Sequence, residues 1–162
     1  MHETIAEALA RADISPCVAV PCKNFLQLLP RLEQDADREL IFVAREEEGL
    51  GVCAGAYLAG RRPVLICQNS GLGNLVNAYC SLNQYFEIPV FLMVSHRGDA
   101  AEKVAAQKPM GEITQPLLDL MQIENHTLAD PAQADEVAGH LEQYKRQRRS
   151  RALLMPASFW KG

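Results

Sequence analysis

The sequence predicts an α/β protein built as a three-layer, doubly wound sheet whose strands are mostly parallel. Short apolar runs alternate with helical patterns along the whole 162-residue chain. The runs lack the polar alternation of a half-exposed strand, so each is expected to be covered by helices on both faces. With 48% hydrophobic residues and no internal repeat, the chain is expected to form a single domain over residues 1–162.

Five apolar runs are predicted as strands, with helices between them. The strands are Ile14–Val20, Leu40–Ala44, Pro63–Gln68, Val90–Ser95 and Ala152–Met155. The helices are one with the stripe Ile5, Ala8 and Leu9, then Phe25–Asp35, Glu46–Ala59, Asn74–Phe86, Ile113–Met121 and Ala132–Arg146. Asn24 is expected to cap the second helix, in which Pro30 must kink the chain or restart the helix.

Charge and composition exclude several classes of function. The 16 basic and 20 acidic residues give a net charge of -4, so no positive field is available to gather a nucleic-acid backbone. The basic run Lys145–Arg151 is interpreted as a helix end that complements the helix dipole rather than as a nucleic-acid patch. No apolar run approaches the ~18–20 residues of a membrane span.

The cysteines and histidines give no metal or disulfide pattern. The five cysteines are odd in number, contain no C-x-x-C, and are interpreted as buried free thiols of a reducing compartment. The four histidines are scattered without ligand spacing, so no metal site is predicted in this chain. Together these features predict a cytoplasmic protein.

Polar segments follow four of the predicted strands directly. In open parallel sheets, ligands bind beyond the carboxyl ends of the strands, so these segments are expected to meet at one edge. Gly71 and Gly73 allow a tight turn that exposes backbone amides, although G-x-G-x-x-G and G-x-x-x-x-G-K are both absent, which disfavours a nucleotide-binding flavodoxin-like domain. The segments are Pro21–Asn24, Arg45–Glu48, Gln68–Asn74 and His96–Gly98.

An acidic triplet starts the helix that follows the second strand. Carboxylates there interact favourably with the helix dipole by ~0.3–1 kcal/mol each, which is one explanation of Glu46, Glu47 and Glu48. The helix that they start is rich in glycine and alanine, at about 1 kcal/mol of propensity per glycine. Such a helix lets a backbone or a flat ligand approach closely, and a glutamate so placed can activate a bound heterocycle.

These residues resemble the pyrimidine-binding domain of thiamine-diphosphate enzymes. That family carries a glutamate nine residues before the glycine of an Ala-x-Gly-Tyr-like element, and here Gly55, with Tyr57 nearby, lies nine residues after Glu46. The segment Gln68–Asn74 resembles the family's Ser-Gly-Pro-Gly-x-x-Asn region. The likeness is closest to the sulfopyruvate and phosphonopyruvate decarboxylases, through that segment and His96-Arg97-Gly98.

The resemblance implies a thiamine-diphosphate and magnesium-dependent decarboxylase that converts 3-sulfopyruvate to sulfoacetaldehyde and carbon dioxide, as in coenzyme M biosynthesis. Glu46 is then the catalytic residue, because protonating the pyrimidine favours the tautomer that activates the thiazolium carbon. Pro21, Asn69, Ser70 and Gly71 are implied to bind the cofactor with it. Phosphonopyruvate stays open as the substrate, because both anions present three oxygens on a tetrahedral centre.

The chain departs from the simple pyruvate decarboxylases at two acid–base positions. Where they carry an aspartate and a His-His pair, this chain reads Cys22-Lys23 and Gln107-Lys108. Cationic and amide donors suit a second anionic group on the substrate, although solvated surface is an equal explanation of the two lysines and of Arg97. His96 is interpreted as structural. The predicted substrate-binding residues are Lys23, Asn24, Arg97, Gln107 and Lys108.

The Gly-Asp-Gly motif and downstream asparagine with which the family binds diphosphate and magnesium are missing. The resemblance therefore implies the alpha half of a hetero-oligomer whose beta subunit carries that domain. A catalytically silent scaffold or regulatory module of the same fold is the alternative from another class.

Overall fold

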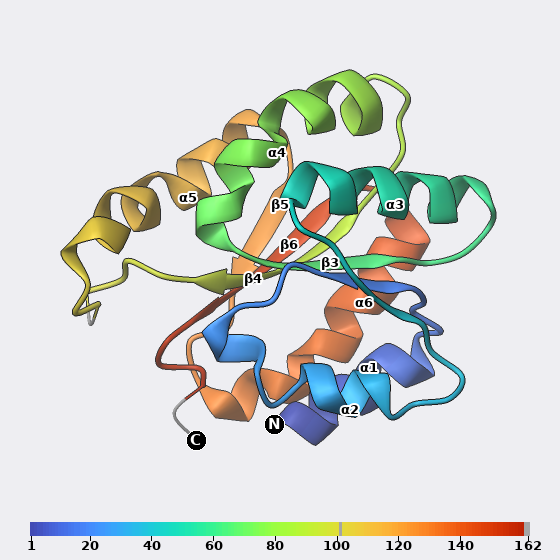
Figure 1. Cartoon of the computed structure of the whole chain (residues 1–162), viewed down its shortest axis with the longest axis horizontal. Coiled ribbons are helices and arrows are strands. Elements are labelled where there is room, and N and C mark those ends of the chain that lie inside the picture. Colours follow the sequence, from blue (N-terminus) through green and yellow to red (C-terminus); the bar gives the residue numbers. More distant parts are fainter. Residues whose placement is uncertain (101, 161–162) are drawn as a thin grey trace.

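Six parallel strands form one sheet in the computed structural model, which describes residues 1–100 and 102–160. Their order is β2-β1-β3-β4-β6-β5, and the central strands β3 and β4 lie between the helical layers (Figure 1). The strands are β1 Cys17–Ala19, β2 Leu40–Phe42, β3 Val64–Gln68, β4 Phe91–His96, β5 Glu124–Thr127 and β6 Arg151–Pro156. The predicted three-layer α/β class is confirmed.

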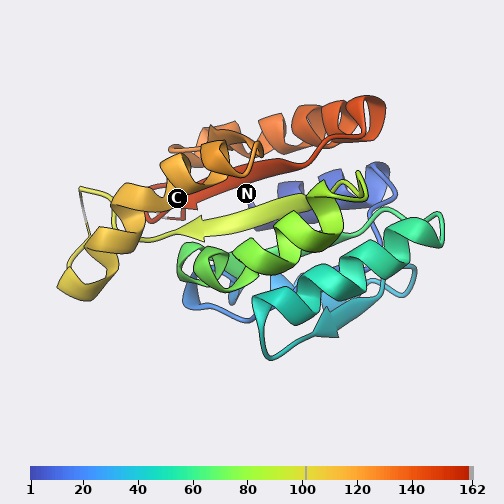
Figure 2. The same cartoon turned by 90° about the horizontal axis from the view of Figure 1, so that it is seen from above.

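Helices cover both faces of the sheet. One layer contains α1 His2–Arg11, α2 Leu29–Glu33 and α6 Glu136–Gln147. The other contains α3 Glu46–Leu58, α4 Leu72–Ala78 and α5 Lys108–Leu120. Figure 2 shows α3 and α4 running alongside each other over the sheet. Short 3-10 turns at Lys23–Phe25, Asn69–Gly71, Ala105–Gln107 and Pro131–Asp135, and a π-helical turn at Tyr79–Gln84, join these elements.

Alternate residues of the central strands enter opposite cores. In β3, Val64 and Ile66 pack in the core with α1, α2 and α6, whereas Leu65 and Cys67 pack in the core with α3, α4 and α5. All four are fully buried. This explains the uninterrupted apolar runs in the sequence, since successive side chains point to opposite faces and both faces are covered.

The edge strand β5 was not predicted. Its sequence, Glu-Asn-His-Thr, contains no apolar residue, and alternate residues along it are exposed. It pairs with β6 alone, so one of its edges is unpaired, and apolar periodicity gives no signal for such a strand.

The prediction that Asn24 caps a helix is wrong. Asn24 lies inside the 3-10 turn, and its side chain donates to Ser95 Oγ at 2.8 Å. The helix α2 begins only at Leu29, which places Pro30 in its first turn, where the missing N–H would have no partner in any case. The chain therefore restarts its helix at the proline.

Most cysteines are buried as expected, and the basic run begins at a helix end as expected. Cys17, Cys53 and Cys67 are buried, and burial raises the pKa of Cys17 to about 12. Cys80 is exposed, so the expectation of burial is wrong for that residue. Lys145 lies in the last turn of α6, as expected for the basic run. In the described part of the chain, no helix has both the length and the apolar character needed to cross a membrane.

Candidate active site

The polar segments after β1, β2, β3 and β4 meet at one edge of the sheet, as predicted. These strands are successive neighbours and all run in the same direction, so their carboxyl ends lie together. The chain crosses from β2 to α3 through extended Arg45, and Glu46 is the first helical residue. The turn Asn69–Gly71 continues β3 directly into α4.

Glu46 is a buried carboxylate whose side chain contacts a neighbouring helix. It is 7% exposed, and its Oε2 accepts a hydrogen bond from Asn74 Nδ2 at 3.0 Å. Gly71 packs against the carboxylate so closely that a Cβ there would overlap Oε1. The backbone of Gly71 is ordinary right-handed helix, so this glycine is needed for space and not for the tight turn that was expected.

The two neighbouring glutamates have local partners. Glu47 Oε1 pairs with Arg45 Nε at 2.6 Å, and Glu48 Oε2 accepts from the backbone N–H of Ala44 at 3.0 Å. A backbone hydrogen bond at the helix start and the Arg45 side chain lower the pKa of Glu47. The helix-start explanation therefore suits Glu48 and one oxygen of Glu47, whereas the second oxygen, Glu47 Oε2, is buried without a partner among the described residues. Glu46 contacts α4 through Asn74.

Asn69 is fully buried and holds three elements together. Its Nδ2 donates to the Arg97 carbonyl at 2.8 Å and to Thr114 Oγ1 at 2.9 Å, and its Oδ1 accepts from the Arg97 N–H at 3.0 Å. The side chain thus joins the end of β3, the loop after β4 and α5. Both N–H groups of its amide are used inside the chain, so this side chain has no donor left for a cofactor.

Gln68 brings a predicted cofactor residue beside a predicted substrate residue. Its Nε2 donates to Ser70 Oγ at 2.8 Å and to Gln107 Oε1 at 3.3 Å. Gln107 therefore keeps its amide N–H groups for a ligand, and Lys108 follows it as the first residue of α5, exposed to solvent. Gln68 was quoted in the sequence motif without a role, and the fold supplies one.

Arg97 has its charge matched within the chain. Its guanidinium contacts both oxygens of Glu102, at 2.6 and 3.0 Å, and the Glu102 side chain is 6% exposed. The hydrogen bond from Arg97, with others from backbone N–H groups, lowers the pKa of Glu102 to about 2. This geometry does not support the predicted role of Arg97 in substrate binding, since two N–H groups of its guanidinium already pair with the Glu102 carboxylate.

The other predicted residues lie along the same edge. Pro21 and Lys23 are exposed, and the contact from Asn24 to Ser95 joins the ends of β1 and β4. His96 Nε2 lies 3.2 Å from the Gly111 carbonyl, in line with its structural interpretation. Thr114 and Glu102 were not identified from the sequence. Thr114 contacts a residue distant along the chain and Glu102 contacts a residue across a loop, and no sequence pattern indicates either contact.

The edge therefore combines a buried glutamate, a glycine pressed against it and a group of amide and cationic donors. No protein-family model matches the chain. The chain is 44% identical over 132 residues to sulfopyruvate decarboxylase subunit alpha of Methanococcus maripaludis, covering 82% of this chain and 79% of that protein. It is 40% identical to the protein of that name from Methanocaldococcus jannaschii, covering 96% of this chain and 93% of that protein.

A more distant likeness is to a longer protein. The chain is 35% identical over 127 residues to phosphonopyruvate decarboxylase of Streptomyces viridochromogenes. This match covers 78% of the chain but 32% of that protein.

Proposed function

Because this chain belongs to the family of sulfopyruvate decarboxylase alpha subunits, we propose that it is the pyrimidine-binding subunit of a thiamine-diphosphate-dependent decarboxylase. The proposed reaction converts 3-sulfopyruvate to sulfoacetaldehyde and carbon dioxide. The names of the relatives support the decarboxylation of sulfopyruvate. The cofactor rests on the likeness of Glu46 and its small-residue helix to thiamine-diphosphate enzymes.

The observation that carries the proposal is the buried carboxylate of Glu46. Among the described residues, Asn74 is the one side chain that donates to it. Burying a carboxylate with so few partners is unfavourable for stability, so we expect a role beyond folding. A scaffold that kept only the fold would have no use for this arrangement. The residues present therefore fit a pyrimidine placed against Glu46 Oε1.

The chain's own groups divide the proposed task between them. When bound, thiamine diphosphate supplies the sink for the electron pair that decarboxylation releases. Glu46 offers a proton at Oε1 to a ring nitrogen of the pyrimidine, while Asn74 holds Oε2 in place. Gly71 leaves the room that the carboxylate needs. Pro21 and Ser70 line the same edge and are proposed to contact the cofactor.

The anionic end of the substrate is proposed to meet Gln107, Lys108 and Lys23. A sulfonate presents oxygens that accept from amide and ammonium groups. Phosphonopyruvate is less well supported as the substrate, because the sulfopyruvate decarboxylase alpha subunits match at higher identity and over most of their own length.

A second subunit is proposed to bind the diphosphate and magnesium. The relatives are named as alpha subunits, which supports a partner chain. The phosphonopyruvate decarboxylase relative extends well beyond the matched stretch, so that protein has room for a further domain in one chain. We place the enzyme in the cytoplasm, in a pathway such as coenzyme M biosynthesis, since buried free thiols suit a reducing compartment.

Reconstitution tests the proposal. The chain is mixed with three components: a beta subunit that contains the Gly-Asp-Gly motif, thiamine diphosphate, and magnesium. The release of carbon dioxide from 3-sulfopyruvate is then measured. We expect no turnover by the chain alone. Glu46→Gln should lower kcat by at least about a hundred-fold, the scale of a lost proton-transfer group, while the complex still elutes at its usual size.

Glu47→Gln is the matched control, because it changes the next residue of the same helix, whose carboxylate pairs with exposed Arg45. Its effect on kcat should be small. Full activity of the Glu46→Gln complex, or steady turnover by the purified chain alone, would contradict the proposal.

A further inference from the structure

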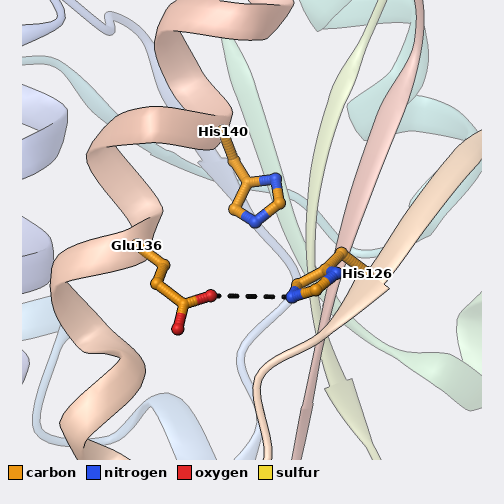
Figure 3. Close-up of side chains that lie close together, drawn as sticks. All are labelled: His126, Glu136 and His140. Atoms are coloured by element: carbon orange, nitrogen blue, oxygen red, sulfur yellow. Dashed lines mark ion pairs between the residues drawn. The ribbon is translucent and has the colours of Figure 1, made fainter.

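Two histidines and a glutamate converge on the side of the molecule that carries the edge strand β5. Figure 3 shows His126, from β5, facing Glu136 and His140, which lie one turn apart on α6. The sequence predicted no metal site, because the histidines lacked ligand spacing. Spacing along the sequence could not reveal this cluster, since β5 was unforeseen and it brings a third residue against an i, i+4 pair.

The spacing of the three side chains is close to that of metal ligands. His126 Nε2 lies 3.6 Å from Glu136 Oε2, and one ligand atom from each residue lies within 4.8 Å of the others. Around a tetrahedral zinc ion with bonds of about 2.0–2.1 Å, ligand atoms are roughly 3.3 Å apart. Small side-chain rotations therefore suffice to close the site.

The three side chains are partly exposed, so water can fill the coordination positions that they leave open on a metal ion. The side chains of His126 and Glu136 are 46% and 47% exposed, and His140 is half-buried. Three protein ligands with an open position are a common arrangement for zinc. Two imidazoles and a carboxylate favour zinc and similar transition-metal ions over magnesium, which prefers oxygen ligands.

The charged surroundings of His140 both help and limit metal binding. An imidazole binds a metal ion in its neutral form. Arg151 Nη1 lies 3.1 Å from His140 Nδ1, so in the absence of metal Nδ1 accepts this bond and Nε2 carries the proton.

Metal binding at His140 Nε2 requires that proton to move to Nδ1 or leave, and Arg151 must release Nδ1. Arg151 keeps its contact with Glu124 Oε2 at 2.6 Å. Glu124 also adds negative charge to the neighbourhood of the site. The lost hydrogen bond should make the site weaker than a closed structural zinc site and more sensitive to pH.

We propose that His126, Glu136 and His140 bind one zinc-class divalent ion that fastens β5 to α6. The site is separate from the candidate active site, because β5 is the outermost strand on the side of the sheet away from β2 and β1. The ion is therefore distinct from the magnesium proposed for the partner subunit, and its role is structural.

Calorimetric titration of the chelator-treated chain with zinc chloride near pH 7 tests the site. We expect one ion per chain at a site that His126→Gln and Glu136→Gln each weaken at least ten-fold, and a rise in Tm with zinc that both variants lose. Magnesium chloride should not compete. Bound cobalt(II) should give visible absorption bands that the variants lack.

Both variants change half-exposed residues, so the variant chains should still fold, and circular dichroism checks this. His140→Gln is avoided because buried Arg151 would lose its hydrogen-bond acceptor on His140. His2→Gln is the matched control, because His2 stacks on Trp160, outside the cluster. It should leave zinc binding unchanged. Zinc binding by the wild type that is no tighter than binding by folded His126→Gln would overturn the proposal.

Discussion

Replacing Asn74 by alanine isolates the contact that orients Glu46, the proposed catalytic residue. The wild-type chain places Asn74 Nδ2 3.0 Å from Glu46 Oε2, and Glu46 is 7% exposed. A hydrogen bond to a charged group contributes about 1.5–3 kcal/mol. Since 1.36 kcal/mol corresponds to a factor of ten, Asn74→Ala should lower kcat by roughly ten- to a hundred-fold.

The assay is decarboxylation of 3-sulfopyruvate by the reconstituted complex, with kcat and KM measured separately. Asn74 is itself exposed, so the Tm of the chain should change little and KM for the substrate should stay near its wild-type value. Asn77→Ala is the matched control, because Asn77 is an exposed amide on the next turn of α4. Equal kcat values for Asn74→Ala and Asn77→Ala would refute a positioning role for Asn74.

Two further predictions concern the substrate and the loop after β4. If the Lys108 ammonium contacts the sulfonate, Lys108→Ala should reduce the ratio of kcat/KM for sulfopyruvate to kcat/KM for pyruvate by roughly ten- to a hundred-fold. An unchanged ratio would show that Lys108 is a solvated surface residue without a role in substrate choice. The pKa of Glu102 falls from 4.5 unfolded to about 2 folded, so its stabilising effect is present above about pH 4.5 and is lost as pH falls toward 2. The Tm difference between wild type and Glu102→Gln should therefore shrink over that range, and a difference independent of pH would exclude this source of acid sensitivity.

The sequence was most informative where one residue's chemistry depends on its own segment. The central strands followed from uninterrupted apolar runs, and Glu46 followed from its place at the start of a helix rich in small residues. Both signals are local. Long-range topology added only that the strand ends meet, which parallel pairing ensures.

The sequence did not indicate which side chains from distant segments would contact each other. Arg97 has the positive charge expected of a substrate-binding residue, but its guanidinium forms an ion pair with Glu102. Asn69 had the position of a cofactor ligand, but Thr114, which is distant along the chain, shares its amide. The polar strand β5 gave no periodic signal, and without it the cluster around His126 could not be anticipated. In each case the sequence does not reveal which of several competent groups lies within bonding distance after folding.

Asn69 also determines how this edge of the molecule can move. Its three hydrogen bonds fix the segment that carries Ser70 and Gly71 to the backbone at Arg97 and to α5, which begins beside Gln107. The turn proposed to contact the cofactor and the helix end proposed to contact the substrate are therefore held together by one side chain. If the proposed function holds, a movement of α5 on substrate binding also moves Gly71, which packs against Glu46. Substrate occupancy and the orientation of that carboxylate would then be coupled within this single chain.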